Sequence, residues 1–243
     1  MTPYGRRFFR NMDSASYRSA TIVVPILMRL FEPKSVIDVG CGVGTWLRAF
    51  TDNGVEDICG VDGKYAEDTG LQIPVQYFHA ADLTLPYKSD RKYDLAVCLE
   101  VAEHLPSEAG STLIQSLCDC ADVVIFSAAI PHQGGTHHVN CRWQSFWASI
   151  FAERGFDCYD IVRPTIWGKD DVCFWYQQNL IVYIRASSPP AAGRVRAAVE
   201  ALDIVHPQLY LSKTFDWPRI KARASKIPRR LTSIIQMHFG QRR

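Results

Sequence analysis

The sequence predicts an α/β protein with a doubly wound, mostly parallel sheet of seven strands, one of them antiparallel near the C-terminal end. Short apolar runs alternate with amphipathic stretches between residues 14 and 186, as in sheets built from strand–helix units. The runs are apolar throughout, which is typical of strands covered by helices on both faces. The last two runs lie close together without a long helix between them, so one of these strands is expected to be antiparallel.

The first half of the chain is expected to supply a helix and then four strands. The helix covers residues 14–31, with Pro25 as a kink or junction. A second helix begins at Thr45 and stops near Gly54, and a third runs from about Ser107 to Cys118. The strands are expected over residues 35–39, 57–62, 75–80 and 93–100.

The second half is expected to add three strands, over residues 122–130, 156–162 and 178–186. A polar, glycine-rich loop over residues 132–140 follows the first of them. Asn140 is expected either to cap the next helix or to orient a substrate hydroxyl. The apolar stripe of that helix is expected to be core, and it consists of Trp143, Phe146, Trp147, Ile150 and Phe151.

Composition indicates one main domain with a basic extension. The chain has 243 residues, 47% of them hydrophobic, and a formal net charge of only +2, so it requires no polyanionic partner. We expect residues 1–186 to form the domain, including the N-terminal helical segment, and residues 187–243 to form a linker and C-terminal extension. From Lys213 to Arg243 there are nine cations against the single acid Asp216.

Cysteine usage and the termini favour a cytoplasmic location. The eight cysteines contain no C-x-x-C pair, which favours reduced thiols over disulfides or a zinc site. The first residues lack the apolar region of a secretory signal, and "TIVVPILM" is too short to span a bilayer. The basic tail is expected either to be solvated or to place a short helix, "IPRRLTSIIQMHFG", on the anionic inner face of a membrane.

The stretch "VIDVGCGVGTW" places three glycines between an apolar strand and a helix, which indicates that a ligand approaches the backbone there. A dinucleotide motif has its third glycine where Thr45 stands. The loop therefore favours a nucleoside that carries an amino acid rather than a pyrophosphate. Asp38 is an acid able to hold the ammonium group of such a ligand.

Two further acids follow the next strands. Asp62 ends the second strand, where an acid accepts the ribose hydroxyls of a nucleoside. Asp82 follows the third strand and is placed to receive the exocyclic amine of adenine. Either acid by itself could instead cap a turn. Together with the glycines, they predict a nucleoside site at the carboxyl edge of the sheet.

The segments "VIDVGCGVGTW", "GVDG", "AADL" and "YDLAVCLEVAEHLP" resemble motifs I to IV of class I S-adenosylmethionine-dependent methyltransferases, and the resemblance covers roughly residues 14–186. It implies a Rossmann-like fold and S-adenosyl-L-methionine as cofactor. The glycines would line the methionine part, Asp62 the ribose, and Asp82 with Leu83 the adenine. The full set implied is Asp38, Gly40, Cys41, Gly42, Gly44, Thr45, Trp46, Asp62, Gly63, Asp82, Leu83, Leu99, Glu100 and Val101, of which the last three form the wall nearest the reacting methyl group.

The later stretches "SAAIPHQGGTHHVNCRWQSFWASIFAERGF" and "IWGKDDVCFWYQQNLIVY" are similar to a bacterial subgroup of methyltransferases associated with surface-glycan biosynthesis. That subgroup usually has an acid after "H-V-N", where this chain has Cys141. Glu103 and His104 match a pair common in the branch that methylates oxygen in small molecules and sugars. The resemblance implies O-methylation of a sugar or glycan precursor.

Methylation of a hydroxyl requires a base, because an alcohol has a pKa far above 7. His138 is the first candidate, since it matches the subgroup's histidine, followed by His137 and His104. No metal is expected, because adjacent pairs such as Asp170 and Asp171 cannot easily both point at one ion. Aromatic rings suit sugar faces, so the expected substrate residues are Asn140, Trp167, Trp175 and Tyr176, with burial in the core as the alternative for the rings.

Other functions remain in view. A small aromatic or lipid-like acceptor is the main alternative to a sugar. A nucleotide-sugar oxidoreductase would have glycine at position 45 and a Tyr-x-x-x-Lys pair, which are absent. Amino-methylating DNA enzymes carry Asn/Asp-Pro-Pro-aromatic after the fourth strand, where this chain reads "LEVAEH", so no nucleic-acid partner is expected.

Overall fold

The computed structural model describes residues 6–189 and 195–214, with side chains from Ser14 onward. The chain divides into two compact units, Met1–Ile204 and Val205–Arg243. The described part of the second unit contains α8 (Pro207–Thr214). Residues 215–243, which include the proposed membrane-contacting helix, lie outside the described residues. The first unit continues past residue 186, and the division into domains 1–186 and 187–243 stays a prediction.

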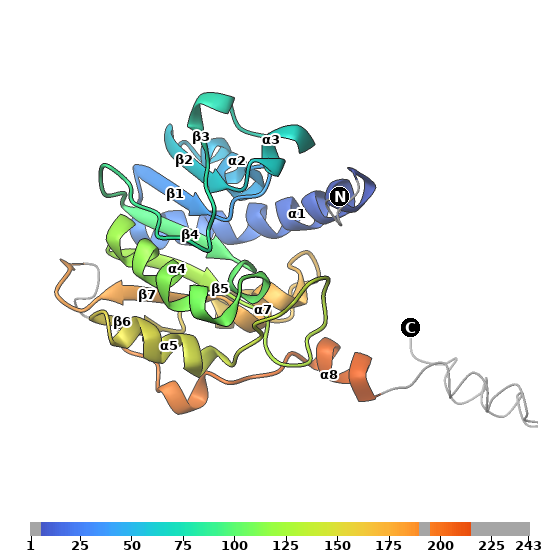
Figure 1. The fold of residues 1–243 in the computed structure, drawn as a ribbon. Helices are drawn as coiled ribbons and strands as arrows, with labels where there is room; N and C mark the ends of the chain where they lie inside the picture. The colour runs from blue at the N-terminus through green and yellow to red at the C-terminus, as the bar shows by residue number, and fades with distance from the viewer. Residues whose placement is uncertain (1–5, 190–194, 215–243) are drawn as a thin grey trace, which may run out of the picture. The chain divides into compact units, whose positions relative to one another are not determined.

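A single seven-stranded sheet organises the first unit, in the strand order β3-β2-β1-β4-β5-β7-β6 (Figure 1). Neighbouring strands from β3 to β5 pair in parallel, and β7 is antiparallel to both β5 and β6. The predicted fold class, with one antiparallel strand near the C-terminal end, is therefore confirmed. The strands are β1 (Ser35–Val39), β2 (Asp57–Asp62), β3 (Phe78–Ala80), β4 (Leu95–Leu99), β5 (Val123–Ser127), β6 (Phe156–Tyr159) and β7 (Ile181–Arg185).

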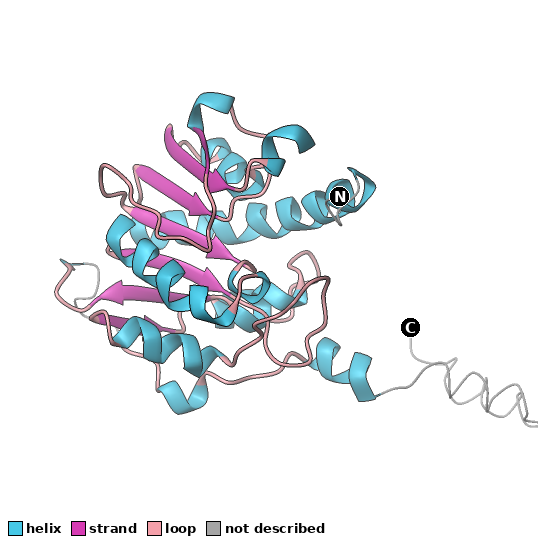
Figure 2. Ribbon diagram, viewed as in Figure 1, coloured by secondary structure: helices cyan, strands magenta, loops and turns pink. Residues whose placement is uncertain are grey.

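Helices connect the strands and cover the sheet (Figure 2). Among the described residues, no helix is long and apolar enough to cross a membrane. The α-helices of the first unit are α1 (Arg6–Phe31), α2 (Thr45–Asp52), α3 (Tyr65–Thr69), α4 (Ser107–Cys120), α5 (Gln144–Ala152), α6 (Arg163–Ile166) and α7 (Phe174–Asn179). Short 3₁₀ turns are η1 (Val75–Tyr77), η2 (Ala102–His104) and η4 (Val199–Ala201).

Both faces of the sheet are buried, as the uniformly apolar strands predict. Val36 packs into a core with α1, α2 and α7, whereas the next residue, Ile37, packs into a second core with α4 and α5. Successive side chains of a strand point to opposite faces, so a strand between two helical layers needs apolar residues at every position.

Several local expectations are wrong. Residues 178 and 179 belong to α7 rather than to the last strand, β7. Residues 75–77 form η1 rather than strand, and β3 pairs with β2 only from Phe78 to Ala80. Asn140 does not cap α5, because the helix begins at Gln144 and its N-cap is Trp143. The apolar stripe of α5 is only half core: Trp147 is buried, but Trp143 and Phe146 are 39% and 37% exposed. A helix against one flat sheet buries only the part of its apolar face that meets the sheet.

The buried side chain of Arg163 hydrogen-bonds to three segments of the first unit. Its guanidinium is 1% exposed and donates to both carboxylate oxygens of Asp160, at 2.9 and 2.8 Å. Its remaining terminal nitrogen donates to the backbone carbonyls of Gln178 and Leu202, each at 3.0 Å. A buried cation is tolerated only when such partners replace its water.

We predict that Arg163→Ala lowers the free energy of unfolding by about 2–4 kcal/mol, because it leaves two buried carbonyls and a carboxylate without their donor. Arg196→Ala is the matched control: its side chain is 67% exposed and pairs with Asp157 at 3.0 Å, so its loss should cost less than about 1 kcal/mol. Urea denaturation followed by circular dichroism measures both. Equal losses in the two variants would contradict the role given to Arg163.

Candidate active site

The carboxyl ends of β1, β2, β4 and β5 meet at one edge of the sheet, because these strands are mutually parallel (Figure 1). The segments that follow them carry the residues that the sequence analysis selected. These are the glycine loop after β1, Asp62 and Gly63 at the end of β2, residues 99–104 after β4, and the histidine loop after β5. Ligands of open α/β sheets bind at this edge.

The glycine loop is a tight turn pressed against the segment after β4. Gly40, Gly42 and Gly44 have φ values of +87°, +55° and +85°, which favour glycine. A Cβ on Gly40 would lie 2.3 Å from Cγ2 of Val101, and one on Gly42 would meet nothing within 4 Å. Of the neighbours expected in the cofactor site, Cys41, Thr45 and Trp46 are buried.

Asp62 joins the ends of β1 and β2. Its Oδ2 accepts the backbone N–H of Gly42 at 2.7 Å, and its Oδ1 accepts the N–H of Gly63 at 2.6 Å and the hydroxyl of Tyr65. Asp38 is buried, and burial followed by the charge of Asp62 raises its pKa well above the usual value. An ammonium group beside Asp38 would favour the ionised form again.

Asp82 lies in a turn after β3. Its exposed carboxylate accepts the hydroxyl and the backbone N–H of Thr84, at 2.7 and 2.9 Å, and these hydrogen bonds lower its pKa. Leu83 beside it is buried. The turn geometry suggested by the sequence as the alternative for Asp82 is thus present, and adenine binding by Asp82 and Leu83 stays a prediction.

A polar network that the sequence analysis missed surrounds Glu100, next to buried Leu99. The carboxylate of Glu100 accepts from Gln133 Nε2 at 3.0 Å and from Asn179 Nδ2 at 3.1 Å. Gln178 Nε2 donates to Gln133 Oε1 at 2.9 Å. Burial raises the pKa of Glu100, and these hydrogen bonds oppose that rise. The available signal was the polar run "YQQN" directly before an apolar strand.

The histidine loop is attached to η2 through the backbone. The N–H groups of Val139 and Asn140 both donate to the carbonyl oxygen of Glu103, at 2.8 and 3.1 Å. This contact brings the ring of His138 to 4.7 Å from the ring of His104, edge to face. His137 is exposed, with a φ of +57°. The three candidate bases thus lie within two adjoining segments.

The pKa values of the two paired imidazoles are both lowered, which favours their neutral forms. Burial, and then the neighbouring His104, lowers the pKa of His138 to about 4. Burial also lowers the pKa of His104, although a hydrogen bond with the His137 backbone opposes this. A neutral imidazole has a free lone pair, so it can accept a proton or bind a metal ion.

The four expected substrate residues differ in how far they are buried and in whether their polar atoms are already hydrogen-bonded. Both polar side-chain atoms of Asn140 are used within the protein, by the Ala102 carbonyl and by Arg142. Tyr176 is buried, and its hydroxyl accepts the indole N–H of Trp46 at 3.4 Å. Trp175 is partly buried against the core, and Trp167 is 38% exposed. Substrate binding by Asn140, Trp167, Trp175 and Tyr176 stays a prediction.

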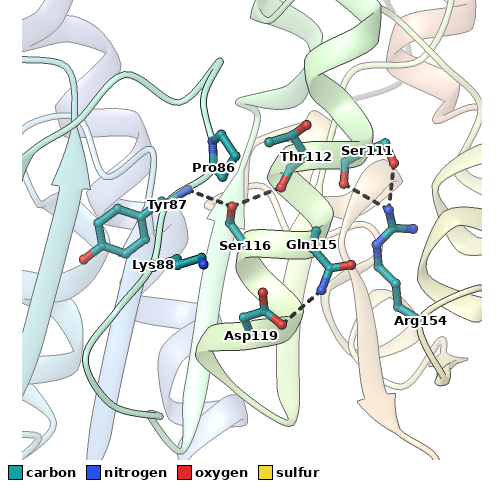
Figure 3. Close-up of a pocket in the computed structure, with 9 residues that line it drawn as sticks. All are labelled: Pro86, Tyr87, Lys88, Ser111, Thr112, Gln115, Ser116, Asp119 and Arg154. Atoms are coloured by element: carbon teal, nitrogen blue, oxygen red, sulfur yellow. Dashed lines mark hydrogen bonds between the residues drawn. The ribbon is translucent and has the colours of Figure 1, made fainter.

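A separate pocket of about 260 Å³ lies beside α4 (Figure 3). None of its lining residues belongs to the segments described above. Several of its polar groups bond to each other: Tyr87 N–H donates to Ser116 Oγ at 3.0 Å, and Arg154 donates to Ser111 Oγ at 2.7 Å. This pocket therefore adds nothing to the candidate site.

Comparisons with known proteins agree with this geometry. Residues 14–128, just under half of the chain, match the family model Methyltransf_23, described as a methyltransferase domain. A ubiquinone biosynthesis O-methyltransferase from Psychrobacter arcticus is 32% identical over 85 residues, which cover 31% of this chain and 33% of that protein. The alignment thus spans about a third of the length of this curated relative.

Solved structures show the same fold. The methyltransferase domain of bacterial CtHen1 is 20% identical, with a TM-score of 0.53 over 69% of this chain and 97% of that one. The magnesium protoporphyrin IX methyltransferase of Synechocystis PCC 6803, solved with bound S-adenosylhomocysteine, is 20% identical, with a TM-score of 0.52 over 73% of this chain and 87% of that one.

The fold and the family match point to one class. Residues 14–128 are similar to a methyltransferase domain, and the solved methyltransferases of this fold include one with bound S-adenosylhomocysteine.

We predict that Gly40→Ala destabilises the protein more than Gly42→Ala. Both substitutions put a side chain on left-handed backbone, which costs about 1 kcal/mol, but only the first also overlaps Val101, which adds about 1–3 kcal/mol. Urea denaturation without cofactor measures the difference. Equal stability of the two variants would show that the loop does not press on Val101 in solution.

Proposed function

We propose that this chain is an S-adenosylmethionine-dependent O-methyltransferase whose acceptor is a hydroxyl of a sugar or glycan precursor. The observation that supports it most directly is the meeting of the glycine loop, Asp62 and the histidine loop at one edge of a methyltransferase fold. The cofactor supplies an activated methyl group, and the protein supplies binding, alignment and exclusion of water.

The cofactor residues are assigned by position. Oδ2 of Asp62 has one protein donor, Gly42, so it can accept a further hydrogen bond from a ribose hydroxyl. The backbone of the glycine loop would pass along the methionine part, with Asp38 near its ammonium group. Val101, which contacts the glycine loop, and Glu100 would form the wall beside the methyl group.

We predict that Asp62→Ala raises the dissociation constant of S-adenosylhomocysteine about 10- to 100-fold, because one or two hydrogen bonds to the ribose are lost. Asp57→Ala is the matched control, since Asp57 begins the same strand and forms an exposed pair with Arg91. Titration calorimetry measures both, with circular dichroism as a check on folding. Unchanged affinity in Asp62→Ala would remove Asp62 from the site.

The acceptor class has one alternative. The short similarity to a ubiquinone biosynthesis O-methyltransferase favours a small aromatic or lipid-like hydroxyl. Trp167 is 38% exposed, and an aromatic side chain suits either a sugar or an aromatic acceptor. Transfer of a radiolabelled methyl group to a panel of nucleotide sugars, glycan precursors and polyprenyl phenols separates the two classes.

The chemical step is an in-line displacement in which the acceptor oxygen bonds to the methyl carbon as the carbon–sulfur bond breaks. The hydroxyl proton must leave, and a histidine is the proposed base. His138 is the first candidate because it lies in the loop that is attached to η2, with its ring beside that of His104. His137 is the second candidate and His104 the third.

We predict that His138→Ala lowers turnover about 10²–10⁴-fold, the usual contribution of general-base catalysis, with little change in cofactor affinity. His138→Gln should be equally slow, because an amide can orient a hydroxyl but cannot take its proton. His132→Ala, an exposed histidine of the same loop, is the control. Steady-state rates are measured with the acceptor that the panel identifies. An active His138→Gln would reduce His138 to a positioning residue.

A further inference from the structure

Glu103, His104 and His138 form a cluster that was not foreseen from the sequence. Each offers one ligand atom, and these three atoms lie within 4.8 Å of one another. We propose that this cluster binds a divalent transition-metal ion in the working enzyme. The proposal rests on the proposed function and adds an ion beside the acceptor hydroxyl.

Glu103 carries the argument. Its side chain is 0% exposed, neither carboxylate oxygen has a well-formed hydrogen bond, and the carboxyl group beside it, Glu100, is another acid rather than a cation. No ion pair among the described residues includes it. The nearby N–H groups of Val139 and Asn140 are used by its backbone carbonyl. A buried carboxylate without partners is costly, and a bound cation supplies what it lacks.

A purely structural role for Glu103 is the alternative. Burial, and then the charge of Glu100, raises the pKa of Glu103 well above its usual value, which favours a neutral carboxyl group when no ion is present. A neutral carboxyl and a glutamine have nearly the same size and both lack charge. Glu103→Gln therefore preserves the structural role and removes the anionic ligand, which makes it the deciding variant.

The ligand set indicates the kind of ion. Two imidazoles and one carboxylate suit Mn²⁺, Fe²⁺, Co²⁺ or Zn²⁺, whereas Mg²⁺ and Ca²⁺ prefer oxygen ligands alone. Two atoms bound to one such ion lie at most about 4.2 Å apart, so the cluster must contract slightly around it. His104 is the most exposed of the three residues and can make that adjustment. Three protein ligands leave coordination positions open for an acceptor oxygen.

The position of the cluster suits the chemistry. η2 directly follows Val101, which contacts the glycine loop, so an ion held there lies next to the proposed methyl-transfer wall. A hydroxyl bound to a cation loses its proton more readily. The oxygen then takes the methyl group, the sulfur keeps the electron pair of the broken bond, and the proton passes to water. His138 is in this case a ligand rather than the base.

The test is a titration of cofactor-free, EDTA-treated protein with CoCl₂, followed by the visible absorption of Co²⁺, and with MnCl₂, followed by electron paramagnetic resonance. The wild type should bind one ion per chain. Glu103→Gln and His138→Ala should each weaken binding at least tenfold, with secondary structure checked by circular dichroism. His132→Ala, from the same loop, should bind as the wild type does.

A second variant moves a ligand without removing it. A Cβ on Gly135 would lie 2.2 Å from Nε2 of His138, so Gly135→Ala must displace that ring. Weaker binding of Co²⁺ in this variant supports the proposal. Full binding by Glu103→Gln, or no binding by the wild type, overturns it.

Titration with S-adenosylhomocysteine in EDTA separates the two proposals. If the cofactor binds and the ion does not, the metal site is wrong and the proposed function stands. If S-adenosylhomocysteine does not bind, the proposed function fails whatever the metal does.

Discussion

The carboxylate of Asp62 holds the turn after β1 to the end of β2, and the rest of the candidate site depends on this contact. Its two oxygens accept the N–H groups of Gly42 and Gly63. Neither glycine has a side chain, so the loops that contain them are held here by hydrogen bonds from their backbones to the same carboxylate. The same turn brings the backbone of Gly40 against Val101. The ends of β1, β2 and β4 are thereby fixed relative to one another before any ligand binds.

A second contact fixes the other side of the site. The carbonyl oxygen of Glu103 accepts two N–H groups of the histidine loop, so the loop after β5 is attached to η2. Because η2 directly follows Val101, which lies against Gly40, the glycine loop and the histidine loop both contact the short segment after β4. Preorganisation of this kind is what a displacement reaction requires of its enzyme.

The sheet could be predicted from the sequence because uniformly apolar strands are a strong signal, and the edge that carries the site follows from their parallel order. The ends of individual strands were harder to predict. Residues 75–77 are apolar enough for a strand, but β3 is an edge strand that pairs with one neighbour only. The half-exposed stripe of α5 could not be foreseen, since periodicity shows that a face is apolar but not how much of it meets the sheet.

The residues of the candidate site could be predicted where they belong to a short sequence motif. They could not be predicted where a hydrogen bond or ring contact joins segments far apart in the sequence. Asp62 and the glycines lie in short motifs with fixed spacing. The bond from Asn179 to Glu100 joins α7 to the end of β4, and no local pattern reports it. The pairing of His104 with His138 likewise depends on how the loop after β5 lies on η2.

Glu100 has a φ of +57°, a conformation that a glycine would adopt with less strain. Its carboxylate is held by Gln133 and Asn179, and these bonds support the unfavourable backbone angle. The backbone angle of Glu100 at the end of β4 and the side chain of Asn179 on α7 are therefore energetically linked. A substitution that removes the amide of Asn179 would leave the left-handed backbone of Glu100 with one side-chain hydrogen bond fewer to offset its strain.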